Sequence, residues 1–190
     1  MRYFLSLGTN LGNRKKNLAL ACSLLEENGA GILRASSVYR TEPVDVPDQP
    51  WFYNQVVEVE TEYDPPALLN LVKAIEKKLK RVPALDKGPR TIDIDILLAG
   101  NTVIQTRRLM IPHPRLTERN FVLVPLREIA PHAVHPLLHK RVIDLVQASA
   151  DLAVVRKLGP GRAKEKDQES DHGKTPGSRL RPVDTRVPIK

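Results

Sequence analysis

The stretch Gly88-Pro89-Arg90-Thr91-Ile92-Asp93-Ile94-Asp95-Ile96-Leu97-Leu98 places two carboxylates two positions apart among isoleucines. Residues two apart point in nearly opposite directions on a helix, whereas on a strand they share one face, about 6.6–7 Å apart at their Cα atoms. The alternation therefore predicts a strand with two unlike faces. One face has Thr91, Asp93, Asp95 and Leu97, and the other has Ile92, Ile94, Ile96 and Leu98, which suit a core.

The two aspartates of this strand predict a metal site. Two ionised carboxylates this close repel each other unless a cation lies between them, and hard oxygen ligands at this spacing suit Mg²⁺ that bridges substrate phosphates. The alternative is an edge strand whose acidic, solvated face discourages aggregation. Nearby cations favour the metal, because arginine forks match phosphate oxygens. These cations are Arg90 before the pair and Arg107, Arg108, His113, Arg115 and Arg119 after it.

Length and composition limit the classes of protein to which the chain can belong. Its 190 residues predict one domain, long enough to bury a sizeable core. Cys22 is the single cysteine, which excludes an intrachain disulfide framework and predicts a reducing, cytoplasmic location. The apolar run at the start of the chain is shorter than a secretory leader, so we expect neither a leader nor a membrane span.

The formal net charge of +8 is divided between a folded region and a tail. Residues 159–190 contribute +3, from eight Lys or Arg and five Asp or Glu. This segment is rich in Gly, Pro and charge, which predicts a disordered basic tail after a domain over 1–158. We expect the tail to be a tolerated extension of a monomer that binds neither nucleic acid nor a membrane.

The patterns on both sides of the Asp-x-Asp strand predict an α+β fold. The expected elements are a strand over Tyr3–Leu7, a helix from Asn13 to Asn28-Gly29, strands over Ile32–Arg40 and Phe52–Glu62, and a helix begun by Asp64 and Pro65. With the Asp-x-Asp strand fourth, the order βαββαβ predicts a ferredoxin-like antiparallel sheet with both helices on one face. A hairpin through Gly100-Asn101 into Thr102–Ile104, then loops and a short helix over 112–150, complete the chain.

Three further groups of residues have a functional and a structural interpretation. His132, His135 and His139 are close in sequence, but the prolines among them prevent alignment on one helix, so we interpret them as loop residues rather than zinc ligands. His113 lies between two prolines in a basic loop, which suits either phosphate binding or a surface turn. Phe52 and Phe121 are either core residues or a clamp for a flat ring, whose edge the amide of Asn54 would bind.

Several ordered motifs resemble those of the 6-hydroxymethyl-7,8-dihydropterin pyrophosphokinases of folate biosynthesis. Besides residues 88–97, the matching segments are Ser6–Gly12, Ile111–Leu116 and Arg119–Leu126, and the resemblance covers residues 1 to about 150. It implies an enzyme that transfers pyrophosphate from MgATP to the hydroxymethyl oxygen of the pterin and releases AMP.

The resemblance also implies roles for individual residues. Asp93 and Asp95 would hold two Mg²⁺ ions, and Arg81 and Arg90 would bind the phosphates. The nucleotide site would be lined by Glu76, Arg81, Arg90, Ile96, Arg108, His113 and Arg119. The pterin would lie between Phe52 and Phe121, and its remaining contacts would be Thr41, Val44, Asn54 and Asp93. The segment Arg81–Gly88 is less basic than the family pattern and has Lys87 where that pattern has Trp, so we expect closure over ATP to differ.

Two other classes of protein remain as alternatives. A nucleotidyltransferase also uses an aspartate pair on a strand, but the chain has no upstream Gly-Ser helix start and no convincing third aspartate. A ferredoxin-like RNA-binding module needs exposed rings on its central strands, where this chain has Asp93 and Asp95. We therefore expect an enzyme rather than a binding module.

Overall fold

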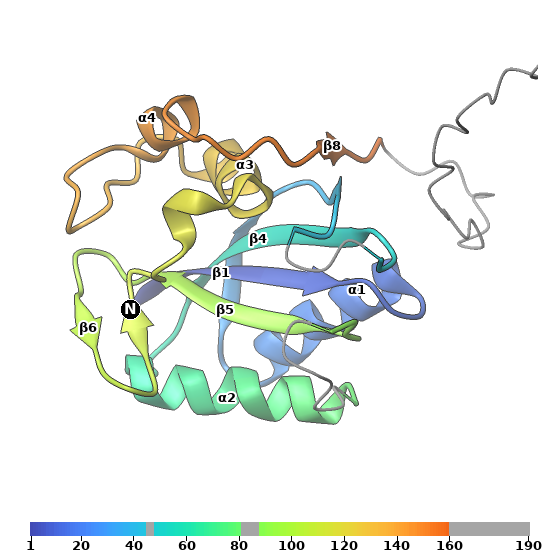
Figure 1. Ribbon diagram of the computed structural model, residues 1–190. Helices are drawn as coiled ribbons and strands as arrows, with labels where there is room; N and C mark the ends of the chain where they lie inside the picture. The colour runs from blue at the N-terminus through green and yellow to red at the C-terminus, as the bar shows by residue number, and fades with distance from the viewer. Residues whose placement is uncertain (45–47, 81–87, 160–190) are drawn as a thin grey trace, which may run out of the picture.

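The Asp-x-Asp stretch forms β5 (Asp93–Leu98), an edge strand of a six-stranded sheet. The computed structural model describes residues 1–44, 48–80 and 88–159 (Figure 1). The other strands of this sheet are β1 (Arg2–Thr9), β2 (Gly31–Ala35), β3 (Tyr39–Thr41), β4 (Phe52–Glu60) and β8 (Val155–Lys157). They follow the order β5-β1-β4-β3-β8, β2 also pairs with β4, and these pairings are antiparallel. The central strands are therefore β1 and β4.

Two helices cover one face of the sheet, and each begins where the sequence predicts. Asn13 caps α1 (Arg14–Glu27) by accepting a hydrogen bond of 2.9 Å from a backbone N–H of the first turn. Asp64 caps α2 (Pro65–Lys78) in the same way at 2.8 Å. The core under these helices includes the alternate strand residues Leu5, Leu7, Val57, Val59, Ile94 and Ile96. The prediction that the isoleucines of β5 pack on a core is confirmed.

A second helical layer lies on the opposite face, where the sequence predicted loops and a short helix over 112–150. It consists of α3 (Asn120–Ile129) and α4 (Val142–Gln147), above the sheet in Figure 1, where α2 lies below it. The apolar stripe of α3 packs on Val56 and Leu97 and forms a second core. The acidic face of β5 is therefore covered at its Leu97 end rather than solvated along its length.

Two predictions about strand boundaries are wrong in detail. The strand predicted over 32–40 is divided into β2 and β3, because Ser36 binds Val56 through both its backbone N–H and its hydroxyl group. The hairpin predicted from Gly100 into Thr102–Ile104 does not pair with β5. Gly100 adopts a positive φ of 54° in a tight turn, and the chain then forms a separate two-stranded sheet. This sheet pairs β6 (Ile104–Gln105) with β7 (Met110–Ile111).

The face predicted for Leu98 is also wrong. Leu98 joins Leu97 in the second core instead of joining the isoleucines. The pairing of β1 with β5 shifts register between Phe4 and Leu5, and this irregularity ends the alternation of side chains along β5. The last residues of the strand therefore do not follow the period of two that holds for Ile94, Asp95 and Ile96.

The strand β8 is an addition to the sheet that the sequence did not predict. Val155 pairs with Thr41, and Lys157 pairs with Tyr39, so the end of the described region lies against β3. The predicted tail lies almost wholly outside the described residues, since only Gly159 of it is described. Among the residues that the structure describes, no helix is long and apolar enough to cross a membrane.

Candidate active site

A pocket of about 620 Å³, including space open to solvent, lies on the face of the sheet opposite α1 and α2. Its floor is made by alternate residues of three adjacent strands. Gly8 of β1 lies opposite Asn54 of β4 and Asp93 of β5, and Ser6 lies opposite Asp95. Every second side chain of a strand points to the same face of the sheet, so the two aspartates share this floor as the sequence predicted.

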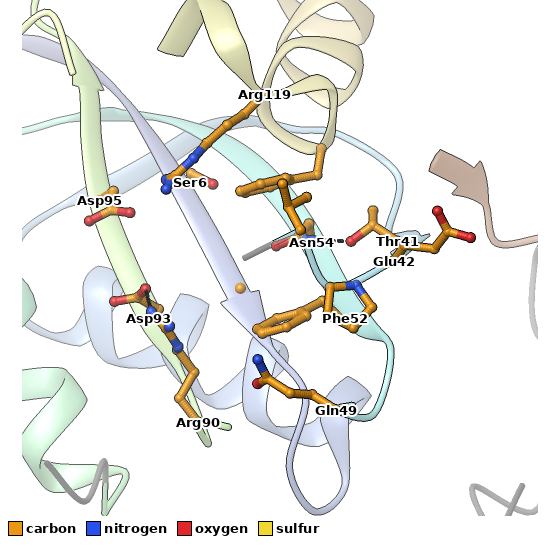
Figure 2. A pocket seen from close by; sticks show the side chains of 14 residues that line it. Ser6, Thr41, Glu42, Gln49, Phe52, Asn54, Arg90, Asp93, Asp95 and Arg119 are labelled. Atoms are coloured by element: carbon orange, nitrogen blue, oxygen red, sulfur yellow. Dashed lines mark hydrogen bonds and ion pairs between the residues drawn. The ribbon is translucent and has the colours of Figure 1, made fainter. Parts of the chain in front are cut away.

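The amide of Asn54 has a fixed orientation in this floor. Its Nδ2 donates a hydrogen bond of 2.7 Å to Thr41 Oγ1, and this contact is buried. Figure 2 shows the same bond between the two labelled side chains. A Cβ atom on Gly8 would lie 2.8 Å from Asn54 Oδ1, which is closer than real side chains approach. Only glycine at position 8 leaves room for the Asn54 amide oxygen in this orientation.

Two aromatic side chains from different layers line the pocket. Phe52 begins β4, and Phe121 is the second residue of α3. The guanidinium of Arg119, also a lining residue, lies 5.4 Å from the centroid of the Phe121 ring. The remaining wall is Thr41 at the end of β3 and the chain after it, with Glu42, Pro43 and Val44. Gln49 lies near Phe52 in Figure 2. The pocket thus combines flat apolar surfaces with amide and carboxylate groups.

The acidic end of the pocket brings two carboxylates close together beside Arg90 and Arg119. Arg90 forms an ion pair with Asp93, and its own backbone N–H donates a 2.7 Å hydrogen bond to Asn10 Oδ1. Burial and the neighbouring charge of Asp93 raise the pKa of Asp95 well above its usual range. Because the charged form of Asp95 is disfavoured by burial and by Asp93, a cation bound at this position would stabilise it. The pair therefore fits a divalent metal ion.

The ligands at this site suit magnesium better than a metal that needs three or more protein side chains. No group of three or more His, Cys, Asp or Glu that could hold a metal occurs within the described parts of the chain. Mg²⁺ commonly takes only one or two carboxylates and completes its shell with water and substrate phosphates. His135 is buried and accepts a hydrogen bond at Nδ1 from Leu138 N, in agreement with the interpretation of the three histidines as loop residues.

Other residues that the resemblance assigned to the nucleotide lie along the outer edge of β5. Glu76 of α2 is buried and accepts a 2.9 Å hydrogen bond from Ile94 N. His113 N donates to Leu97 O, also at 2.9 Å. Ile96 lies between these two contacts, with its side chain in the core. Arg108 lies farther away, between β6 and β7, and contacts Asn70 of α2 at 3.5 Å.

His113 adds no positive charge at neutral pH to the basic loop that contains it, because its pKa lies well below 7. Burial and the charges of Arg119 and Arg115 lower its pKa to about 4, although the charge of Asp93 opposes them. Its Nδ1 accepts a hydrogen bond from Arg115 N at 3.2 Å, so the ring proton is on Nε2. His113 can therefore donate one hydrogen bond without adding a positive charge.

The structure brings most of the expected pterin and phosphate residues into one pocket. The predicted residues that line it are Thr41, Val44, Phe52, Asn54, Arg90, Asp93, Asp95, Arg119 and Phe121. Glu76, Ile96, Arg108 and His113 are outside this set, and Arg81 lies outside the described residues. Sequence reasoning missed Ser6, Gly8, Glu42, Pro43 and Gln49. The alternation of Ser6 and Gly8 with buried Leu5 and Leu7 was a usable signal for the first two.

Curated proteins of known activity match much of the chain. The 2-amino-4-hydroxy-6-hydroxymethyldihydropteridine pyrophosphokinase of Bacillus subtilis is 44% identical over 127 residues, which are 66% of this chain and 76% of that protein. The enzyme of the same name from Haemophilus influenzae is 38% identical over 159 residues, covering 83% of this chain and 98% of that protein. The folic acid synthesis protein fol1 of Pneumocystis carinii is 46% identical over 134 residues, but this chain spans only 18% of its length.

Solved structures and a family pattern agree with these matches. A crystal structure of an HPPK-DHPS protein in complex with substrates has a TM-score of 0.62 at 18% identity, covering 77% of this chain and 43% of that one. The wild-type HPPK-DHPS of Plasmodium falciparum has the same TM-score at 19% identity, with 77% and 44% covered. Both show the likeness of fold. The pattern of the family described as 7,8-dihydro-6-hydroxymethylpterin-pyrophosphokinase (HPPK) matches residues 4–131, more than half of the chain. The chain therefore belongs to the 7,8-dihydro-6-hydroxymethylpterin-pyrophosphokinase family.

Proposed function

We propose that this protein transfers pyrophosphate from MgATP to the hydroxymethyl oxygen of 6-hydroxymethyl-7,8-dihydropterin and releases AMP, in folate biosynthesis. Family membership and the names of the matched bacterial enzymes support this reaction. The single observation that carries it is a pocket with an amide and aromatic rings at one end and an Asp pair with arginines at the other. Figure 2 shows Asn54 and Phe52 on one side and Asp93, Asp95 and Arg90 on the other.

The pterin is assigned to the end lined by the rings. Phe52 and Phe121 offer faces on which a flat bicyclic ring can stack. Because Asn54 Nδ2 is engaged with Thr41, its Oδ1 is the acceptor available for an N–H on the edge of the ring. The backbone at Thr41 and Val44 supplies further polar groups along that edge. The hydroxymethyl group would then extend toward Asp93.

The phosphates are assigned to the end with the carboxylates. Asp93 and Asp95 are the residues that would hold two Mg²⁺ ions, which when bound neutralise phosphate charge and lower the pKa of the attacking hydroxyl. Arg90 and Arg119 would spread the charge that develops during transfer. Arg81 is proposed as a further phosphate ligand from the resemblance alone. These residues act by holding reactants in line and stabilising charge.

The nucleoside is assigned to the outer edge of β5. Glu76, Ile96 and His113 follow one another along this edge, and the Nε2–H of His113 is a neutral donor. Arg108 would reach the same region from between β6 and β7. ATP would then lie across β5, with its triphosphate over Asp93 and Asp95. This placement leaves the ring end of the pocket to the pterin.

The finer description of the fold is part of the same proposal. The order β5-β1-β4-β3, with α1 and α2 on one face, supports a ferredoxin-like unit to which a C-terminal extension of α3, α4 and β8 is added. We propose one catalytic domain over residues 1–158, acting as a cytoplasmic monomer. The 160–190 segment has no assigned part in the reaction.

One assay tests the proposed reaction. The protein is incubated with ATP, Mg²⁺ and the reduced hydroxymethylpterin, and the products are identified by phosphorus NMR and chromatography. We expect AMP and a pterin that carries two phosphates, in equal amounts. ADP with a monophosphorylated pterin would contradict the proposal, because it places the attack on the γ-phosphorus. Free pyrophosphate with a nucleotide attached to the acceptor would indicate a nucleotidyltransferase. Mixtures lacking the pterin serve as the control for ATP hydrolysis.

A further inference from the structure

Residues 151–158, here called the C-terminal brace, contact both walls of the pocket although they lie beyond the residues matched by the family pattern. One wall is the start of α3, which bears Phe121, and the other is the chain after β3. The brace leaves α4, passes the first wall at Asp151 and reaches the second at Val154. It then pairs with β3 as β8.

Asp151 holds the residue between two pocket side chains. Its Oδ2 accepts a hydrogen bond of 2.7 Å from Asn120 N, and its backbone oxygen accepts one of 2.6 Å from Asn120 Nδ2. Asn120 stands between Arg119 and Phe121, which both line the pocket. A residue bound at its main chain and its side chain has little freedom to rotate. Its neighbours are therefore fixed in direction as well.

The carboxylate of Asp151 provides a cap that α3 does not make for itself. Arg119 occupies the N-cap position of this ten-residue helix and makes no side-chain capping bond. The second carboxylate oxygen, Oδ1, accepts a hydrogen bond of 2.9 Å from Ala153 N within the brace. One carboxylate oxygen thus accepts from α3 and the other from the brace. The negative charge of Asp151 at the N-terminus of α3 is also favourable.

The brace fixes the second wall through Glu42. Val154 N donates a 3.0 Å hydrogen bond to Glu42 Oε2, and Glu42 N donates one of 3.2 Å to Val154 O. Figure 2 shows the Glu42 carboxylate directed away from Asp93 and Asp95, on the side where β8 lies. Glu42 therefore lines the pocket with its stem while its charged group is bound to the brace.

We propose that Asp151 is a positioning residue for pterin binding. It acts through Asn120 and sets the position of the Phe121 ring relative to the wall that Val154 and Glu42 hold. The proposal rests on the assignment of the pterin to this pocket. A displacement of a stacking ring by a fraction of an ångström weakens binding most at the ring end of the pocket. Among the described residues at the ATP end the brace reaches only Arg119, and Asp93, Asp95 and Arg90 keep their positions on and beside β5.

The test compares Asp151→Ala, Asp151→Asn and a matched control, Asp144→Ala. Asp144 is a half-buried aspartate of α4 whose carboxylate is bound to Arg141 at 2.8 Å, and it does not line the pocket. For each protein, the KM values of the pterin and of ATP are measured well below the melting temperature. Pterin affinity is also titrated directly through the fluorescence of Trp51, the single tryptophan, which precedes Phe52.

We expect Asp151→Ala to raise the KM of the pterin about tenfold while that of ATP changes by less than about threefold. Asp151→Asn should fall between this variant and the wild type, because its amide oxygen can still accept from Asn120 N. Asp144→Ala should match the wild type. If Asp151→Ala does not fold, the same split between the two KM values is required of Asp151→Asn.

Two results would overturn the inference. One is a lower melting temperature with an unchanged KM for the pterin, which assigns Asp151 to stability alone. The other is an equal rise of both KM values. A failure of the proposed function is distinct, because the wild type and Asp144→Ala would then give no AMP at all, and the inference would fall with it.

Discussion

At the scale of single residues, the observed orientation of the Asn54 amide requires glycine at position 8. A methyl group on Gly8 would approach Asn54 Oδ1 to 2.8 Å, so the amide must move if Gly8 is replaced by alanine. We expect Gly8→Ala to raise the KM of the pterin about tenfold or more and to leave that of ATP within about twofold. Steady-state kinetics with each substrate varied in turn would measure both values.

Gly31→Ala is the matched control for that substitution. Gly31 also lies in a strand of the same sheet, but an added Cβ would meet only Glu60 O, at an ordinary distance of 3.8 Å. We expect wild-type kinetics from this variant. If Gly8→Ala also kept wild-type kinetics for the pterin, the Asn54 amide would not be the group that binds the ring edge.

We expect substitutions of the two aspartates of β5 to change the melting temperature in different directions. Asp95→Asn removes a charge that burial and Asp93 already disfavour, so we expect the melting temperature without divalent metal to stay equal or rise. Asp93→Asn leaves the partly buried Arg90 without its ion-pair partner, so we expect the melting temperature to fall. Both should lower turnover by about 10²-fold or more.

Calorimetry and activity assays with the same protein samples would test this contrast. Turnover near the wild-type rate in either variant would argue against a metal role for the pair. A fall in melting temperature for Asp95→Asn as large as that for Asp93→Asn would show that Lys73 and Arg119 outweigh burial and the charge of Asp93 at this carboxylate, which contradicts the raised pKa of Asp95.

Local pattern predicted the site residues whose chemistry repeats with the period of a strand, whereas the family resemblance supplied others, such as Val44 and Phe121. Asp93 and Asp95 follow this rule because alternation is a local property of the chain. Ser6 and Gly8 obey the same alternation but carry no charge, so the pattern did not single them out. Asp151 could not be found in this way, because its partner Asn120 lies 31 residues earlier and nothing local indicates their contact.

At the scale of elements, Glu128 joins α3 to two segments that are distant in sequence, residues 37–39 and β8. Its carboxylate accepts hydrogen bonds from Ser37 N at 3.0 Å, from Tyr39 OH at 2.8 Å and from Lys157 Nζ at 2.9 Å. Burial alone would raise its pKa, but these bonds outweigh burial and lower the pKa to about 2. The residue therefore fastens β3 and β8 to the second helical layer.

The lowered pKa of Glu128 predicts how stability depends on pH. The folded pKa of about 2 lies below the ordinary value of 4.5, so the contribution is complete above pH 4.5 and is lost as the pH falls toward 2. We expect Glu128→Gln to lower the free energy of unfolding by about 1–2 kcal/mol at neutral pH and to remove this part of the acid dependence. Urea unfolding at several pH values would measure it.

Glu60→Gln is the comparison for Glu128→Gln, because Glu60 forms an exposed ion pair with Arg2. Exposed pairs contribute little, so its unfolding curves should follow those of the wild type. Equal effects of the two substitutions would mean that the bonds of Glu128 do not hold the elements together.

The elements that the sequence missed are those whose stability comes from distant contacts. β5 was predictable because its pattern is strong over six residues. α3 contains Pro125 and is stabilised by an apolar stripe packed on the far face of the sheet, which a local pattern does not reveal. β8 has only three residues and exists because β3 offers a free edge beside it.

At the scale of the whole molecule, the pocket is held by residues within the first 158 positions. We therefore expect a chain ending at residue 159 to keep its turnover and its melting temperature. A chain ending at residue 150 lacks Asp151 and β8, and we expect a lower melting temperature and a raised KM for the pterin. Kinetics and thermal unfolding of the two truncated proteins would compare them.

Each truncated chain has one result that would contradict the expectation. Loss of activity in the protein ending at residue 159 would show that residues 160–190 belong to the catalytic unit, against the prediction from their composition. Full activity in the protein ending at residue 150 would show that the brace is dispensable.

The position of β8 in the sheet also determines when the pocket can be completed. Val154 binds Glu42 across 112 intervening steps of the chain, and at 5–20 residues per second a ribosome needs roughly 6–22 s to make that length. The start of α3 is made late in this time, and until Val154 follows, this helix end and the wall after β3 lack the strand that joins them. A nascent chain therefore acquires its hydrophobic layers first and its substrate-binding shape last.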